Sequence, residues 1–368
     1  MHKIILLVVF AVLIIGCTSQ TPPEPTKQMP KSSEYQKPAE PPKIEPTAKP
    51  EPPITNPEPK TENTKPKTVI PEPTPVPAPK IIPDPAPQVF NPASYGKPHP
   101  KIKQPHPDCC NHPYWHQVYR AFSSDKGASW EKENILIKDH ASVPDAILKD
   151  DGMIISYYVD GEFDSVDCIV SKDNGKIFSA GNCTIYGFTE EKAWDPEVVK
   201  LDDGRYRMYF YAPKQQRLFE DNSIMSAISE DGVSWLQEDG VRFKHKGIID
   251  PAVIKMGDVW RLYVWYPSGT GPGDATIVVA KSEDGLNFVK EKEFSVGGGI
   301  PDIIKLNGKY ALYFCSDGIS RVTSSDGLSW SNKENVMPAN MGEVNCDPSI
   351  IKTKDKWTMF YKVQKMRQ

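Results

Sequence analysis

The chain has 368 residues, 37 of them proline, and carries 44 basic against 48 acidic side chains, a formal net charge of −4. This near balance provides no strongly basic surface of the kind that nucleic-acid binding requires. The sequence contains no glycine-rich nucleotide loop, no Ser-His-Asp set and no helical metal motif, so it indicates neither nucleotide chemistry nor triad hydrolysis.

The first residues are typical of an export signal. Lys3 precedes an apolar run from Ile4 to Ile15, which is shorter than the ~20 residues that a membrane-spanning helix needs. The run ends in Leu-Ile-Ile-Gly-Cys, which resembles the lipobox of prokaryotic lipoproteins and implies a lipid on Cys17. We therefore expect a lipoprotein signal peptide at residues 1–16 and an extracytoplasmic, membrane-anchored protein. An ordinary cleaved signal peptide or an uncleaved anchor is the alternative.

A proline-rich segment follows the signal. Residues 21–100 contain 25 of the 37 prolines and a single glycine, Gly96. Such a composition buries too little apolar surface to offset its ordering entropy, and proline stiffens it toward polyproline II. We expect residues 17–100 to be a disordered, semi-rigid linker, with peptide recognition as the weaker alternative, and residues 101–368 to form one domain.

Five copies of a turn signature divide this domain. Asp-Gly or Asp-x-Gly supplies the positive φ and the side-chain bonding of a tight hairpin, and an aromatic residue follows. The copies resemble the Asp-box turns of sialidases, which are structural rather than catalytic. They are Ser123-Ser-Asp-Lys-Gly-Ala-Ser-Trp130, Ser171-Lys-Asp-Asn-Gly-Lys-Ile-Phe178, Ser229-Glu-Asp-Gly-Val-Ser-Trp235, Ser282-Glu-Asp-Gly-Leu-Asn-Phe288 and Ser324-Ser-Asp-Gly-Leu-Ser-Trp330.

A second signature pairs proline with aspartate and also occurs five times. Apolar and aromatic segments with period-2 alternation follow each copy, which predicts four strands per repeat. Repeats of this kind are propeller blades, and residues 114–136 supply the two strands that the last repeat lacks. We therefore predict an all-β, five-bladed β-propeller whose ring is closed by these N-terminal strands. The signatures are Pro144-Asp145, Asp195-Pro196, Asp250-Pro251, Pro301-Asp302 and Asp347-Pro348.

The first strand of each blade lines the channel of a propeller, so the five aspartates are expected to form a ring at one mouth. Paired carboxylates under an aromatic rim suit glycoside cleavage, and crowding of like charges raises carboxyl pKa values. The aromatic residues expected at this rim are Trp194, Tyr158, Tyr211 and Trp265.

The region 114–368 resembles the five-bladed glycoside hydrolases of the arabinanase, xylosidase, invertase and levansucrase type (families 43 and 32). The resemblance implies that Asp145 is the base or nucleophile and that Asp195 is the carboxylate that tunes and positions. The acid position falls on Asp250, where the family has Glu, so Glu197 is a second candidate. Loop alternatives are Glu162, Glu220 and Glu343, and the expected substrate-binding residues are Asp302, Asp347 and the four rim aromatics.

The main alternative to a surface glycoside hydrolase is a non-catalytic propeller that binds carbohydrate or acts as a scaffold. It has support from the presence of aspartate in every blade, because catalysis needs differentiated positions. No other cofactor or metal is predicted, apart from a Ca²⁺ ion that the carboxylates could hold at the channel mouth.

Six cysteines besides Cys17 indicate disulfides in an exported protein. Cys168 and Cys183 flank one hairpin turn and are predicted to pair. Cys109, Cys110, Cys315 and Cys346 are left to pair among themselves. Either Cys315 joins Cys346, leaving a vicinal bridge, or Cys109 and Cys110 crosslink to the other two, and the second arrangement is better motivated because it would pin the closing strand. Four histidines of residues 99–116 match no metal-finger spacing and are expected to be exposed to solvent.

Overall fold

The computed structural model describes residues 96–104, 110–188, 192–212, 221–267, 275–353 and 356–365. The predictions for the signal peptide, Cys17, Cys109 and most of the linker concern residues outside these ranges. The chain divides into two compact units, Met1–Ile81 and Ile82–Gln368, and every feature below belongs to the second. Among the described residues the only helix is a short 3-10 turn, η2 (Pro113–Trp115), and none is long and apolar enough to cross a membrane.

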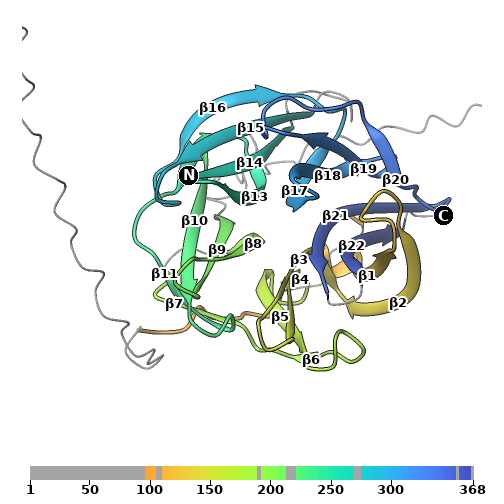
Figure 1. Cartoon of the computed structure of the whole chain (residues 1–368). Coiled ribbons are helices and arrows are strands. Elements are labelled where there is room, and N and C mark those ends of the chain that lie inside the picture. The colour runs from red at the N-terminus through yellow and green to blue at the C-terminus, as the bar shows by residue number, and fades with distance from the viewer. Residues whose placement is uncertain are drawn as a thin grey trace, which may run out of the picture. The chain divides into compact units, whose positions relative to one another are not determined.

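The described strands form five sheets around a common centre, the predicted five-bladed β-propeller (Figure 1). Blade one contains β3 (Ala141–Leu148), β4 (Ile154–Asp160), β5 (Ser165–Ser171) and β6 (Ser179–Ala180). Blade two contains β8 (Trp194–Lys200), β9 (Tyr206–Ala212), β10 (Asp221–Ser229), β11 (Ser234–Gln237) and β12 (Phe243–Lys246), and β7 (Thr184–Tyr186) pairs with β11.

The other three blades have four strands each. Blade three contains β13 (Ile249–Met256), β14 (Val259–Pro267), β15 (Ala275–Ser282) and β16 (Val289–Phe294). Blade four contains β17 (Gly299–Leu306), β18 (Lys309–Ser316), β19 (Gly318–Ser324) and β20 (Glu334–Met337). Blade five contains β21 (Glu343–Lys352), β22 (Trp357–Lys365), β1 (His116–Ser123) and β2 (Glu131–Asp139).

Blade five joins the two ends of the propeller, as predicted. β1 pairs antiparallel with β22 along its whole length, from His116 opposite Gln364 to Ser123 opposite Trp357. β2 then pairs with β1 and completes the sheet order β2-β1-β22-β21. Without β1, the last β-strand of the chain would present a row of unpaired main-chain groups.

The second strand of each blade provides most of the core, because neighbouring blades cover it on both sides. In β4 and β9 every residue is buried, polar ones included. In four blades, one buried tyrosine of the second strand bonds to the neighbouring blade. Tyr157, Tyr209, Tyr263 and Tyr313 each donate a hydrogen bond of 2.7–3.0 Å to the carbonyl of a turn glycine in the next blade: Gly232, Gly285, Gly327 and Gly127.

The junction between blade five and blade one replaces this tyrosine contact. Phe360, which lies opposite Ser349 in the register of β22, occupies the tyrosine position and has no hydroxyl. Phe360 packs edge-on against Phe178 of blade one, with ring centroids 5.9 Å apart. The carbonyl of Gly175 accepts its hydrogen bond from the guanidinium of Arg120 instead. The buried carbonyl is therefore satisfied at all five junctions, although by different side chains.

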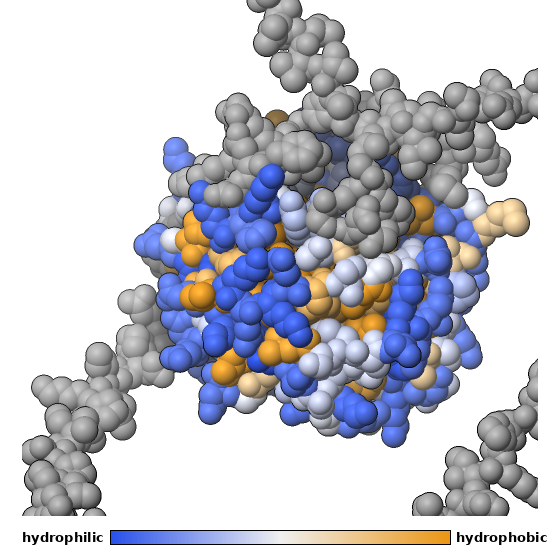
Figure 2. Space-filling view, turned by 90° about the horizontal axis from the view of Figure 1, so that it is seen from above, coloured by the Kyte–Doolittle hydropathy of each residue, from blue (hydrophilic) through white to orange (hydrophobic). Residues whose placement is uncertain are grey.

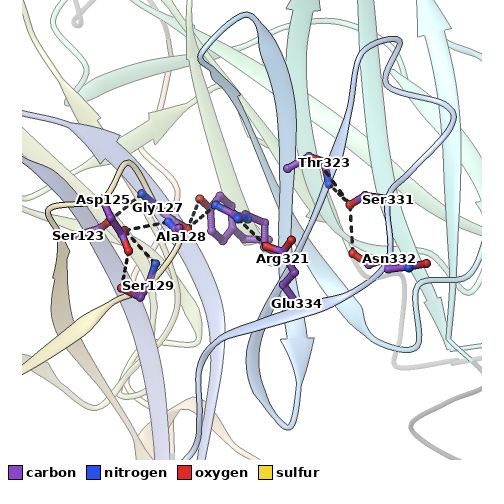
Figure 3. A network of polar contacts seen from close by, with 11 residues as sticks. Ser123, Asp125, Gly127, Ala128, Ser129, Arg321, Thr323, Ser331, Asn332 and Glu334 are labelled. Atoms are coloured by element: carbon purple, nitrogen blue, oxygen red, sulfur yellow. Dashed lines mark hydrogen bonds and ion pairs between the residues drawn. The ribbon is translucent and has the colours of Figure 1, made fainter.

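The five hairpin turns share one hydrogen-bond pattern. In blade five, Ser123 Oγ donates to Asp125 Oδ1 (2.7 Å) and accepts from the amide of Gly127 (2.7 Å) (Figure 3). Asp125 also accepts from the amides of Ala128 and Ser129. Hydrogen bonds from Ser129 are the main reason that the pKa of Asp125 is lowered to about 2. The aspartates therefore organise the turns rather than a reaction centre.

The disulfides confirm one prediction and correct another. Cys168 and Cys183 are joined, with Cα atoms 5.4 Å apart. Cys315 is joined to Cys346 (Cα–Cα 4.9 Å), so the better-motivated expectation of crosslinks from Cys109 and Cys110 to these two was wrong. The reason is the way the blades pack. The end of β18 in blade four lies beside the start of β21 in blade five, which brings the two sulfur atoms together.

The expectation of exposed histidines also fails at His116. This side chain is 4% exposed and makes hydrogen bonds to Ser142 Oγ (2.9 Å) and the carbonyl of Cys110 (3.0 Å). Burial lowers its pKa to about 3, so it is neutral in the folded protein. His116 opens β1 and connects the closing strand to β3 of blade one.

We predict that a chain starting at residue 137 will not fold cooperatively, because β22 would lose its partner β1 and blade five half of its strands. Urea unfolding followed by near-UV circular dichroism measures this. A chain starting at residue 96 is the matched control and should unfold as the full chain does. Equal unfolding midpoints for the 137 variant and its control would contradict the proposed closure.

Candidate active site

The first strands of the five blades, β3, β8, β13, β17 and β21, line the central channel, and their starting ends define its mouth. Each strand has a register irregularity at an X-Pro-Y tripeptide, and residue X has a positive φ of 46–57° in every blade. This backbone conformation is costly for residues other than glycine and is uncommon before proline. Its repetition in all five blades shows that the fold imposes it. The X residues are Val143, Asp195, Asp250, Ile300 and Asp347.

We had expected the five aspartates of the second signature to form one ring at the mouth. They instead lie on two levels along the channel. The prolines align between blades, so Pro-Asp and Asp-Pro place their carboxylates two residues apart. The mouth ring consists of the X residues and contains three carboxylates, those of Asp195, Asp250 and Asp347. The deep ring consists of the Y residues, which are Asp145, Glu197, Ala252, Asp302 and Ser349. This difference supplies the differentiated positions that a uniform ring would lack.

The deep ring holds the blades together. Its oxygen atoms accept hydrogen bonds from main-chain amides of the next blade: Asp145 from Val198 (2.8 Å), Glu197 from Val253 (2.8 Å), Asp302 from Ile350 (2.9 Å) and Ser349 from Ala146 (2.9 Å). Ser349 also donates to the second oxygen of Asp145 (2.9 Å). Both oxygens of Asp145 thus have protein partners, and only Ala252 lacks a side chain that can make the contact.

The mouth ring combines its three carboxylates with one ammonium group. Lys362 Nζ of β22 lies 2.8 Å from Asp347 Oδ2, and both side chains are buried. Asp347 also accepts a hydrogen bond from the amide of Val143 (3.3 Å) and donates its own amide to Cys315 Sγ (3.1 Å). A single lysine faces three mouth-ring carboxylates, so full ionisation of all three would leave uncompensated buried charge.

This imbalance raises the proton affinity of the carboxyl groups. Burial, followed by the charges of Asp195 and Asp347, raises the pKa of Asp250 well above its usual range. Burial and the Asp347 charge raise the pKa of Asp195 to about 7. In the deep ring, burial raises the pKa of Asp145 to about 7, and burial with the Asp145 charge raises that of Asp302 to about 8. The site therefore holds protons at neutral pH, next to the ion pair of Asp347.

The hollow between the two rings is small. Its volume is about 20 Å³, and every residue that lines it belongs to one of the five X-Pro-Y tripeptides. A cavity of this size has room for about one water molecule. A sugar ring does not fit inside a hollow of this size.

The predicted rim aromatics divide into two groups. Trp194 and Tyr211 lie opposite each other on β8 and β9, with ring centroids 6.4 Å apart, directly beside Asp195. Trp265 is opposite Ile249, next to Asp250. All three are therefore near the mouth. Tyr158 is only 3% exposed, beneath Lys138, and does not reach the cavity.

Lys362 is the residue of the site that sequence reasoning missed. It lies in the segment Phe360-Tyr361-Lys362-Val363, whose other members are buried. A lysine within such an apolar strand is the signal that could have identified it. Glu162 and Glu343 do not line the cavity, and Glu220 is outside the described residues.

In the described part of the chain, one set of three potential metal ligands brings its atoms within 4.8 Å of one another: Cys315, Cys346 and Asp347. The two sulfurs are bonded to each other and are not available as thiolates. No three carboxylates of the rings meet this distance, so they do not form a ready-made cation cage.

No protein-family model and no curated protein matches this sequence. Solved structures do match it. One is a family-43 β-xylosidase/α-arabinofuranosidase from a compost microbial metagenome in complex with xylotriose (17% identity, 60% of this chain and 84% of that chain, TM-score 0.46). Others are a thermostable family-43 glycoside hydrolase (13%, 62% and 90%, 0.49) and an α-L-arabinofuranosidase from Lactobacillus brevis (14%, 58% and 80%, 0.47). These are enzymes of the type that the sequence resembles, but at such identities the chemistry has to be inferred from the site itself.

The raised carboxyl pKa values predict that stability decreases as pH rises. In the folded state these carboxyl groups hold protons up to about pH 7–8, whereas in the unfolded chain they have lost them by pH 5. The folded state therefore binds more protons than the unfolded chain between pH 5 and 8. The free energy of unfolding should therefore fall over this range, by about 1.4 kcal/mol for each tenfold difference in proton affinity. Asp302→Asn, which retains an acceptor for Ile350, should reduce the slope.

Chemical denaturation at pH 5, 6, 7 and 8 measures this dependence. The exposed Asp150→Asn variant is the control and should keep the wild-type slope. A wild-type stability that rises from pH 5 to pH 8 would show that the buried carboxyls are ionised in the folded state.

Proposed function

We propose that this protein is a glycoside hydrolase whose reacting carboxyl groups are those of the mouth ring. The observation that carries the proposal is that Asp195, Asp250 and Asp347 border one water-sized hollow but share a single ammonium, that of Lys362. Glycoside hydrolysis needs a carboxylic acid and a carboxylate on either side of the bond that is cleaved. Neighbouring carboxyls in different environments are how proteins provide the two forms at one pH.

The charges assign a role to each group. Asp250 keeps its proton, because burial and two carboxylate neighbours raise its pKa, and it would protonate the leaving oxygen. Asp347 forms the ion pair with Lys362 and would act as base or nucleophile. Asp195, whose pKa is raised to about 7, would hold the substrate by a hydrogen bond. The base role that the family resemblance assigned to Asp145, and the acid role of Glu197, remain predictions in competition with this assignment.

The aromatic side chains near the mouth support a saccharide substrate. Trp194 and Trp265 are half-buried beside Asp195 and Asp250 and could contribute the aromatic surface that sugar-binding sites need, whereas Tyr211 is buried behind Trp194. We propose a poly- or oligosaccharide substrate that lies across the mouth, with one sugar ring over the hollow.

A non-catalytic carbohydrate-binding or scaffold propeller is the second candidate function. Two observations favour it: the deep-ring carboxylates are engaged in hydrogen bonds between blades, and the hollow is too small for a sugar. Surface anchoring through the lipid on Cys17 belongs to both candidates and remains a prediction from the sequence.

A Ca²⁺ ion at the mouth also remains a prediction. The carboxylates of both rings are hard oxygen ligands in excess over Lys362, which suits the ion, although no three of their oxygens converge. If Ca²⁺ binds there, millimolar CaCl₂ should raise the melting temperature above that in EDTA, and Asp195→Asn should remove the increase. Identical melting curves with CaCl₂ and EDTA would exclude a structural Ca²⁺ site.

The hydrolase proposal predicts measurable turnover of aryl β-xylosides, aryl α-arabinofuranosides or a soluble polysaccharide by the whole chain. Asp347→Asn and Asp250→Asn should each lower kcat by roughly 10²–10⁴-fold, the usual contribution of one acid or base group. Asp145→Asn should cost less than either. The exposed carboxylate of Asp202, which pairs with Lys255, gives the matched control Asp202→Asn, with unchanged rates.

The pattern of losses separates the candidates. Loss in Asp145→Asn with full activity in Asp347→Asn would transfer catalysis to the deep ring. Saccharide binding with no turnover of any substrate would establish the non-catalytic alternative.

A further inference from the structure

A second hollow lies at the outer edge of the propeller, between blades three and four. Its volume is about 500 Å³, within the range of ~300–1,000 Å³ that small-ligand pockets occupy. It shares no residue with the channel cavity. One wall is formed by β16 and the residues that follow it, Lys292 to Val296, and the other by Leu328 to Lys333 after the last hairpin turn. We call this hollow the edge groove.

The edge groove exists because the outermost strand of blade four is short. β20 begins at Glu334 and pairs with β19 only along Ile319–Arg321. In the adjoining blade, β16 pairs with β15 from Ile277 to Lys281. The residues before β20 are held instead by contacts around Ser331, whose amide donates to the carbonyl of Thr323 (2.9 Å) and whose Oγ accepts from the amide of Thr323 (2.9 Å) (Figure 3).

The floor of the edge groove is aromatic. Trp330 and Phe294 lie with ring centroids 5.7 Å apart, and Leu328 and Val296 extend the apolar surface. Trp330 is half-buried, whereas three of its counterparts in other turns, Trp130, Trp235 and Phe288, are at most 8% exposed. The side of the molecule that carries β16 shows apolar surface between hydrophilic margins (Figure 2).

The rim of the edge groove is basic and polar. Lys292 and Lys333 contribute ammonium groups, Ser329, Ser331 and Asn332 contribute hydroxyl and amide groups, and no carboxylate lines the groove. Lys292 donates to the carbonyl of Leu328 (2.7 Å) and Lys333 to Ser316 Oγ (2.9 Å), which leaves each ammonium two further donors. Glu291 and Glu293 of β16 are paired with Arg261 and Lys290. The groove therefore has positive charge without a described acidic partner.

We propose that the edge groove is a second ligand site, specific for a saccharide whose units bear carboxylates. The apolar face of one sugar ring contacts Trp330, and the serine and asparagine groups meet its hydroxyls. Lys292, bound to the carbonyl of Leu328, and Lys333, bound to Ser316, lie toward opposite ends of β19, so each meets a carboxylate of a different sugar unit. An apolar floor with a cation toward each end matches a saccharide whose units bear carboxylates better than a neutral one, because only the former compensates both charges. The inference does not depend on hydrolysis at the channel.

Isothermal titration of the whole chain with trigalacturonic acid tests the proposal. Lys292→Gln and Lys333→Gln should each weaken binding by roughly tenfold, the effect of losing one hydrogen bond to a charged group. Trp330→Ala should reduce it further. Because Trp330→Ala removes core contacts with Tyr263 and Phe294, Trp330→Phe provides a folded variant, expected to bind several-fold more weakly than wild type.

Three controls define the outcomes. Lys290→Gln, on the same strand but outside the groove, should bind as wild type does. Maltotriose, a neutral trisaccharide, should bind at least tenfold more weakly than the acidic probe. Asp347→Asn should not affect binding. The proposal is overturned if trigalacturonic acid does not bind, if maltotriose binds equally well, if Lys290→Gln is as harmful as the groove variants, or if Asp347→Asn abolishes binding, which would place the ligand in the channel.

Discussion

The propeller depends on side chains that reach from one blade to the main chain of the next. Every strand pairing described here lies within a blade, so no hydrogen-bonded ladder crosses a blade junction. Two sets of contacts take its place: deep-ring oxygens bound to amides near the channel, and tyrosine hydroxyls bound to turn carbonyls farther out. Leaving one such buried group without a partner costs about 1–3 kcal/mol.

The same architecture determines where chemistry can occur. In the deep ring of four blades, a side-chain oxygen accepts a hydrogen bond from an amide of the next blade, whether it belongs to a carboxylate or to Ser349, and Ala252 is the exception. The fold therefore favours an oxygen at this position. In the mouth ring the requirement is weaker, because Val143 and Ile300 occupy the same position as three aspartates. Carboxylates at a position that tolerates valine are not needed for folding, and this is the physical reason to look for function in Asp195, Asp250 and Asp347.

The blades, the turns, the closing strands and the Cys168–Cys183 disulfide were predictable because each is specified by local spacing. Whether each carboxylate lies in the mouth ring or the deep ring was not predictable. Pro-Asp and Asp-Pro look equivalent in the sequence, and only the structure shows that the prolines align at the register irregularity of each first strand. Cys315–Cys346 depends on how two blades abut, which no local pattern encodes. The contact between Lys362 and Asp347 was not predictable for the same reason. The strand that contains Lys362 was predicted, but its partner lies in a different strand, β21.

The pairing of His116 with Gln364 has a consequence for how the blades should be compared. The two ends of the propeller meet as hydrogen-bonded neighbours in one sheet, so the domain is, in topological terms, a closed loop that the chain happens to open within blade five. Blade one is first only in numbering. A circular permutant cut at another hairpin would preserve every strand pair. The differences among the five X-Pro-Y sites therefore come from the side chains in and around them, not from the order of the blades.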